Sequence, residues 1–161
     1  MFREMRRKKQ LLSQEKTEEI FRRASSGVLA VSGDDGYPYA VPVSFVYADG
    51  KIYIHCAKSG HKLDGIARSS KVSFCVIDRD EIVPSAYTTY FRSVIAFGQA
   101  GIMTDEAEIR AVMGLLAVKY SPLESEESRQ AEIDKTISRL CMIEISVEHM
   151  TGKEAIELVN Q

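Results

Sequence analysis

The sequence predicts a mainly β protein in which about six strands form an antiparallel sheet that closes into a barrel, with helices at its ends. Runs rich in β-branched and aromatic residues follow one another closely and are mostly separated by short turns. In the first half of the chain they lie too close together for the helical crossovers that parallel strands need. Closure is expected because it removes exposed strand edges.

The N-terminal third begins with a helix and continues with hairpins. Ser13 can cap a helix whose apolar face includes Ile20 and Phe21, and Gly27 ends this helix and opens the β region. Asp49-Gly50 lies between two alternating runs, which is a strong short-range hairpin signal. The expected β elements are a strand over 28–31, a turn over 33–36, a return strand over 37–47, and a strand over 51–56 that follows the turn at 48–50.

The remainder alternates strands with helices. A short helix is expected around Leu63 and Ile66, and a helix begins at Thr104-Asp105-Glu106 and is broken by Pro122. The polar segment 78–85, which contains Pro84, is predicted to be a loop. The other expected elements are strands over 71–77, 88–102 and 140–147 and a polar helix over 126–138, all in one domain spanning 1–161.

Composition excludes several classes of partner and site. The 21 basic and 23 acidic side chains give a net charge of −2, which provides no reason to expect nucleic acid. No apolar stretch is long enough for a membrane span, and the start of the chain lacks the apolar core of a secretory signal, so we expect a cytoplasmic protein without a membrane partner. Cys56, Cys75 and Cys141 have no metal-type spacing, and no metal site is predicted.

The segment 52–62 is the most informative for chemistry. A strand leads through a turn of small residues into a helix start at Gly60-His61-Lys62. A helix N-terminus offers unpaired N–H groups, and Lys62 with His61 or Lys58 can supply cations, which together suit a phosphate monoester. An ordinary strand-to-helix turn with solvated lysines is the alternative for this segment taken alone.

Two further segments carry unusual residues. Arg92 interrupts an aromatic strand over 88–98, where it either holds a ligand phosphate or faces water. Pro42 cannot donate to a sheet ladder, so its strand has an edge or a bulge there, which can turn backbone groups toward a flat heterocycle. A plain bulged strand explains Pro42 equally.

Taken in order, these segments resemble the FMN-binding split barrels related to pyridoxamine-phosphate oxidase, and within that group the nitroimidazole-resistance-type flavoproteins. The resemblance covers nearly the whole chain and rests on the order and spacing of the segments 5–11, 36–43, 52–55, 60–62, 92–98 and 149–153. It implies a six-stranded Greek-key split barrel that binds FMN, or FAD, at the interface of a homodimer. The implied flavin-binding residues are Val41, Pro42, Val43 and Ser44 along the ring, His55, Cys56, Gly60, His61 and Lys62 around the phosphate, and Arg92, Ser93 and Val94, often from the partner subunit.

The resemblance is incomplete at the phosphate turn. Gly60-His61 stands where the oxidases carry Ser-Arg, and the chain has no tryptophan and no recognisable C-terminal Arg segment for pyridoxal phosphate. We therefore expect an FMN-dependent oxidoreductase that exchanges electrons with a small donor and acceptor, such as a nitro-aromatic compound, rather than a pyridoxamine-phosphate oxidase. No side chain is an evident acid or base, so no catalytic residue is assigned.

Two other functions remain open. The barrel could bind flavin or haem without turnover, with His55 or His61 as haem ligands, or it could be a structural dimer with a vestigial pocket. The sequence does not decide between FMN, FAD and a deazaflavin.

Overall fold

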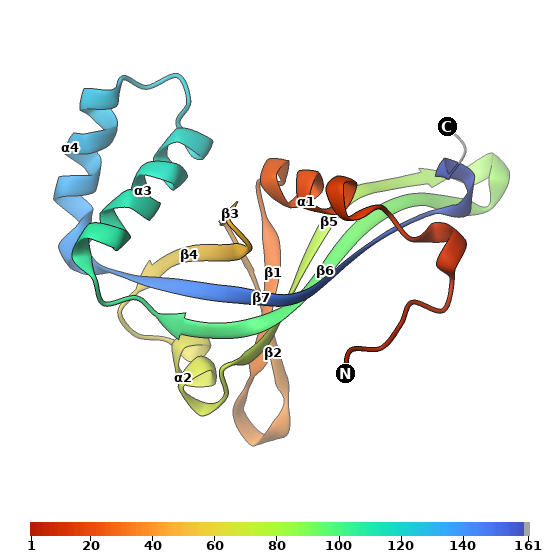
Figure 1. Cartoon of the computed structure of the whole chain (residues 1–161), viewed down its shortest axis with the longest axis horizontal. Coiled ribbons are helices and arrows are strands. Elements are labelled where there is room, and N and C mark those ends of the chain that lie inside the picture. The colour runs from red at the N-terminus through yellow and green to blue at the C-terminus, as the bar shows by residue number, and fades with distance from the viewer. Residues whose placement is uncertain (160–161) are drawn as a thin grey trace.

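A computed structural model describes residues 1–159. Its centre is one seven-stranded antiparallel sheet in the order β2-β1-β5-β6-β7-β4-β3. The strands are β1 (Gly27–Ser32), β2 (Pro38–Val43), β3 (Val46–Ala48), β4 (Lys51–Ala57), β5 (Lys71–Val83), β6 (Thr88–Ile102) and β7 (Leu140–Glu154). The helices are α1 (Gln14–Arg23), α2 (His61–Arg68), α3 (Glu106–Tyr120) and α4 (Glu126–Thr136). Figure 1 shows the α3–α4 hairpin at one end of the sheet and the tip of the β5–β6 hairpin at the other.

The predicted fold class, a mainly antiparallel sheet with peripheral helices, is confirmed, with seven strands in place of six. The expected closure into a barrel is not: within the described residues β2 and β3 remain the two edges of an open sheet. The difference in strand number lies in the segment 37–47, which was expected to be one return strand and is divided into β2 and β3. These two strands occupy opposite edges of the sheet, yet only Ser44 and Phe45 separate them in the chain. The sheet therefore curls, so that the chain can pass directly from one edge to the other, but no ladder joins β2 to β3 within the described residues.

Local sequence accounts for several boundaries. The Ser13 hydroxyl accepts a hydrogen bond from the Lys16 amide at 3.2 Å and caps α1 as predicted. Asp49 and Gly50 both adopt positive φ angles, 49° and 76°, and form the β3–β4 turn. Pro42 lies in an edge strand, as its missing N–H requires.

Two predicted boundaries were wrong. Residues 78–83 belong to β5, not to a loop, and β7 continues seven residues beyond 147, to Glu154. Both extensions build a long arm. The alternation of apolar and polar residues along this arm is weak because much of its surface is exposed. Arg79 follows the bulge of this arm; its guanidinium pairs with the Glu81 carboxylate and lies 5.9 Å from the Tyr90 ring centroid.

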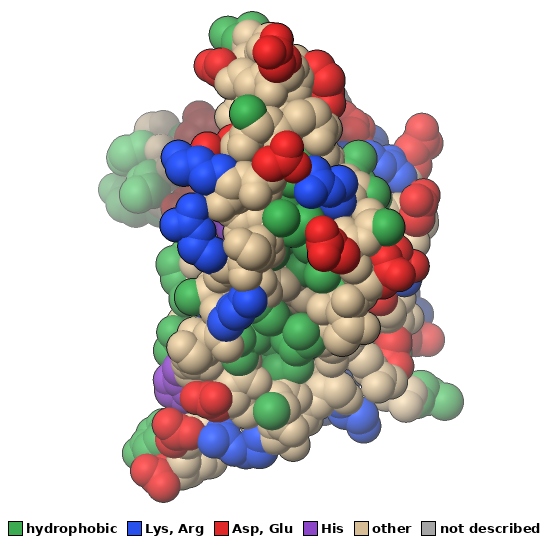
Figure 2. Space-filling model, turned by 90° about the vertical axis from the view of Figure 1, so that its left-hand side faces the viewer, with side chains coloured by type: hydrophobic (Ala, Val, Ile, Leu, Met, Phe, Trp, Pro, Cys, Tyr) green, Lys and Arg blue, Asp and Glu red, His purple; other side chains and the backbone are tan. Residues whose placement is uncertain are grey.

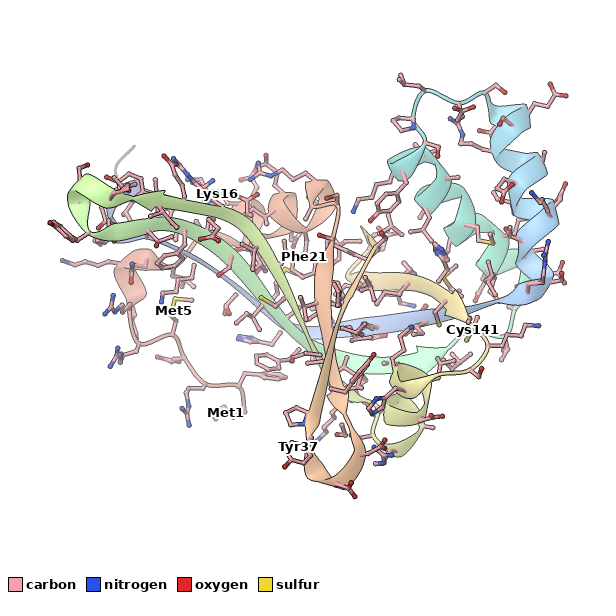
Figure 3. All side chains as sticks on the ribbon, turned by 180° about the vertical axis from the view of Figure 1, so that it is seen from behind. Met1, Met5, Lys16, Phe21, Tyr37 and Cys141 are labelled. Atoms are coloured by element: carbon pink, nitrogen blue, oxygen red, sulfur yellow. The ribbon has the colours of Figure 1, made fainter. Side chains whose placement is uncertain are left out.

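The main core fills the inside of the curled sheet. Phe21 of α1 points into it (Figure 3) and packs against Phe45 and Phe74, with ring centroids 5.7 and 5.8 Å away. A second, smaller core lies on the outer face, where Val112 and Leu116 of α3 cover Met142 of β7. Both faces of β7 are therefore buried near its start. This packing fixes α3 at the end of the sheet where β4 ends.

Within residues 1–159, each helix is too short or too polar to cross a lipid bilayer. The same residues contain no cluster of three or more potential metal-binding side chains.

Candidate functional site

A large cavity lies between the α3–α4 hairpin and the end of the sheet, with a volume of about 1390 Å³. Figure 2 looks onto this end of the molecule and shows hydrophobic side chains in a recess, with Lys and Arg side chains mainly on its left and Asp and Glu side chains above it and on its right. Four residues predicted for the site line this cavity together: Ser44, His55, Cys56 and Lys62. They come from the β2–β3 junction, the end of β4 and the first turn of α2, so segments distant in sequence meet at one place.

The β2–β3 junction is held in position by the C-terminal end of α3. The Phe45 amide donates to the Tyr120 hydroxyl at 2.8 Å, and the Phe45 carbonyl accepts from the Lys119 ammonium at 2.8 Å. The Tyr120 hydroxyl also donates to the Ser25 carbonyl at 2.6 Å. Burial lowers the pKa of Lys119 to about 8. This clamp fixes the exposed Ser44 at the cavity wall.

The start of α2 presents a backbone suited to an anion. Gly60 precedes the helix with φ 138°, a value that favours glycine, and no side chain caps the helix. The Gly60 carbonyl accepts from the amides of Leu63 and Asp64, which leaves the first N–H groups of the helix without an intrahelical partner. A helix end of this kind favours negative charge.

His61 is not among the residues that line the cavity. Its ring stacks on Tyr39 of β2, with ring centroids 4.0 Å apart, and its Nε2 lies 3.5 Å from an Asp34 carboxylate oxygen. The contact with Asp34 does not satisfy hydrogen-bond geometry, and Nε2 is buried without a partner within the described chain. The stacking positions the helix start against β2.

Two cations at the cavity have no carboxylate partner among residues 1–159. One is Lys62, and the other is Arg139, whose guanidinium donates to the Lys135 carbonyl. Arg129, by contrast, pairs with Glu126 at 3.0 Å and bonds backbone carbonyls at the end of α3. Lys62 and Arg139 are therefore the cavity's unpaired cations among residues 1–159, and the carboxylates Glu124 and Glu132 line the same cavity.

Arg139 was missed from the sequence, as was the whole α3–α4 wall. Arg139 precedes β7, and because Leu140 pairs with Ala57, it enters the cavity beside the end of β4. The apolar wall comes from α3, with Met113 and Leu116. The apolar residues of this segment recur at helical spacing and so predict a helix. The surface against which that helix packs is formed by the pairing of β4 with β7, which lie some 85 residues apart in the chain, and a local sequence pattern does not encode such a pairing.

The remaining predicted residues lie outside the cavity. Val41, Pro42 and Val43 lie in the edge strand β2, where Val41 and Val43 pack against the core and Pro42 is exposed. Gly60 directly precedes the cavity-lining turn but does not itself line the cavity. In β6, Ser93 is partly buried and Val94 is fully buried in the core.

Arg92 is held by carboxylates of its own chain on the β5–β6 arm. Its guanidinium lies 3.0 Å from Glu154 and 3.4 Å from Asp78, and Asp78 also pairs with Arg23 at 2.6 Å. The pKa of Arg23 is raised, first by its hydrogen bond to Asp78. The network stabilises the bulge between Ile77 and Arg79, and Arg92 does not reach the cavity of its own chain.

Comparison with known proteins identifies the family. A family model described as pyridoxamine 5'-phosphate oxidase matches residues 13–154. The chain belongs to this family. Solved structures similar to this pyridoxamine 5'-phosphate oxidase family member share its fold, a split barrel of mainly antiparallel strands with peripheral helices.

Three of these structures represent the range of relatives. A conserved hypothetical protein from Mycobacterium tuberculosis has a TM-score of 0.80 at 19% identity, with coverage of 94% of this chain and 90% of that chain. A candidate 5-nitroimidazole antibiotic resistance protein from Bacteroides thetaiotaomicron has a TM-score of 0.74 at 21% identity, with coverage of 89% and 86%. An FAD-binding protein from Mesorhizobium loti has a TM-score of 0.64 at 20% identity, with coverage of 90% and 96%. No curated protein matches this family member significantly.

Proposed function

We propose that this protein binds FMN in the cavity beside Lys62 and acts as an FMN-dependent oxidoreductase on small electron donors and acceptors. The observation that carries the proposal is the combination of two cations unpaired within the described chain, Lys62 and Arg139, with an apolar wall in one cavity of a pyridoxamine 5'-phosphate oxidase family member. The cations and the uncapped start of α2 suit a phosphate monoester. The apolar wall suits a planar ring, as is usual for cofactor sites.

The chain's own residues would bind and orient the flavin. Lys62, Arg139 and the first N–H groups of α2 would hold the phosphate with His55 beside them, while Ser44 would offer hydrogen bonds along the ring. Bound FMN supplies the electron-transfer chemistry, and the protein supplies position and electrostatics. The α3–α4 wall restricts access of water to one side of the cavity.

Flavin titration into the purified protein tests this proposal. We expect the visible absorbance of FMN to shift and the melting temperature to rise on binding. Lys62→Ala should weaken FMN affinity by about 10- to 100-fold, the effect of losing one charge-assisted hydrogen bond of about 1.5 to 3 kcal/mol. Lys58→Ala is the matched control, because Lys58 is exposed and lies outside the cavity lining.

The titration also separates the alternatives. FAD is the first competitor to titrate, because the similar Mesorhizobium loti protein is described as FAD-binding, and a deazaflavin is the second. Reduction of the bound flavin by NADH or NADPH supports turnover, whereas bound flavin that neither reduces supports a carrier. A Soret band in the purified protein would favour haem, with His55 as the ligand that lines the cavity. Equal affinities for Lys62→Ala and the wild type would refute the site.

We further propose that the protein is a homodimer. Ile77 of β5 and Ile95 and Phe97 of β6 are 66%, 42% and 40% exposed on the outer face of adjacent strands, and Cys75 pairs directly with Ile95 between them. Such an apolar surface favours burial against a second copy. In this arrangement the Arg92-Ser93-Val94 strand would approach the partner's flavin. Sedimentation velocity should give a dimer, and a monomer at micromolar concentration would contradict the proposal.

A further inference from the structure

Two of the three cysteines face each other across neighbouring strands. Cys56 near the end of β4 pairs directly with Cys141 near the start of β7. Figure 3 labels Cys141 at this position, between the α3–α4 hairpin and α2. Directly opposed residues of antiparallel strands have Cα atoms about 4.5 to 5.5 Å apart, which lies within the range of about 4.4 to 6.8 Å found for disulfides.

The environment of the pair connects it to the cavity. Both thiols are free and partly buried, and Cys56 lines the cavity that also contains Lys62. Burial raises the pKa of Cys56, the positive charge of Lys62 lowers it, and the neighbouring Cys141 raises it. The register of β4 and β7 places the two cysteines directly opposite one another, and Cys56, which lines the cavity, is the one that a molecule in the cavity would meet first.

The pair also lies where the sheet can adjust. Only the Ala57–Leu140 pair lies beyond it at this end of the β4–β7 ladder. Opposed Cβ atoms in an antiparallel pair are about 4.5 to 5.5 Å apart, and a disulfide needs about 3.5 to 4.5 Å, so the strand ends must approach slightly. A disulfide closed against some strain is easier to reduce than a relaxed structural one, which suits a reversible reaction.

We propose that Cys56 and Cys141 form a redox-active dithiol that reacts with small organic disulfides entering the cavity. The Cys56 thiolate attacks one sulfur of the small disulfide, a mixed disulfide forms, and the other half leaves as a thiolate that takes up the proton lost by Cys56. The Cys141 thiolate then attacks the Cys56 sulfur and expels the second half as a thiol. The protein dithiol is oxidised, and one small disulfide is reduced to two thiols.

This activity goes beyond flavin binding and is independent of it. No step in the exchange requires the cofactor, so the reaction is measured on the flavin-free protein. Loss of the exchange would leave the flavin proposal untouched, and failure of flavin binding would leave the exchange untouched. The two are linked only by location, because a ligand filling the cavity covers the approach to Cys56.

Oxidised glutathione is the probe. Reduced wild-type protein is incubated with it, the remaining thiols are alkylated after acid quenching, and intact mass and peptide mapping follow. We expect a product lighter by two hydrogen atoms, with a Cys56–Cys141 peptide that dithiothreitol reverses. Cys141→Ser should instead retain one glutathione on Cys56, because the second thiol is missing, and Cys75→Ser should behave as the wild type.

The outcomes separate a dithiol from two unrelated thiols. A stable glutathione adduct on wild-type Cys56 without closure would overturn the proposal, as would an unreacted pair in folded protein whose thiols react after urea unfolding. The decisive measurement uses the wild type, so it holds even where a Cys141 variant folds poorly. Far-UV circular dichroism and thermal melting of each variant establish that trapping on Cys56 occurs in folded protein.

Discussion

Removal of the Tyr120 hydroxyl should destabilise the junction that forms the cavity wall. In Tyr120→Phe the Phe45 amide loses its acceptor at 2.8 Å, and Phe45 is fully buried, so water does not readily replace it. A buried donor left unpaired costs about 1 to 3 kcal/mol. The bond to the Ser25 carbonyl contributes less, because Ser25 is exposed and its carbonyl can bond water. The Lys119 bond to the Phe45 carbonyl remains in the variant.

Urea unfolding followed by circular dichroism measures this loss. We expect the free energy of unfolding to fall by about 2 kcal/mol with an unchanged m-value, and the melting temperature to fall by about 4 to 8 °C for a chain of this size. Tyr87→Phe is the control, since Tyr87 is almost fully exposed at the tip of the β5–β6 hairpin. A Tyr120→Phe variant within about 0.5 kcal/mol of the wild type would refute the clamp, because that is the range of ordinary surface substitutions.

Three other perturbations test the energetics elsewhere. Burial lowers the pKa of Lys119 from 10.5 to about 8, so between these values the unfolded chain binds a proton that the folded chain has released. The wild type should therefore gain stability relative to Lys119→Met as the pH rises through this window, as measured by urea unfolding on either side of it; a constant difference would contradict the shift. Gly98→Ala should cost about 1 to 3 kcal/mol, because a Cβ there would overlap the backbone carbonyl of β7, whereas Gly101→Ala meets nothing and should be nearly neutral in the same thermal melts. Arg92→Met should destabilise by about 3 kcal/mol, since Glu154, whose side chain is only 9% exposed, loses its cation; adding Glu154→Gln should recover part of this loss in a double-mutant cycle, and additive effects would show that the pair is not coupled.

Elements fixed by local chemistry could be predicted from the sequence. The Ser13 cap and the Asp49-Gly50 turn depend on a few adjacent residues, and both formed as expected. The 15-residue strand over 88–102 also matches β6, because its β-branched and aromatic residues favour an extended chain throughout. Pro42 correctly indicated an edge strand, since its missing N–H excludes a central position.

Features that depend on distant partners could not be predicted. The run Asp78-Arg79-Asp80-Glu81 reads as a loop by composition, but Asp78 is neutralised by Arg23 and Arg92, which lie 55 and 14 residues away. The break between β2 and β3 likewise has no local signal, because it arises where the chain crosses from one edge of the curled sheet to the other. Arg139 lies at the cavity only through the pairing of β7 with β4, so no motif around it indicates a site.

The position of the candidate site follows from how the sheet is connected. β4 ends where α2 begins, and β7 begins beside that end because the α3–α4 insertion returns the chain there. The β2–β3 junction reaches the same place, since it passes from one edge of the curled sheet to the other. Residues at strand ends and junctions are not paired in the sheet ladder. Ser44, Lys62 and Arg139 can therefore carry polar or charged side chains there without disturbing the core. The clamp from Tyr120 to Phe45 then joins the α3–α4 wall to the junction, and this contact makes the cavity depend on the helical insertion as well as on the barrel.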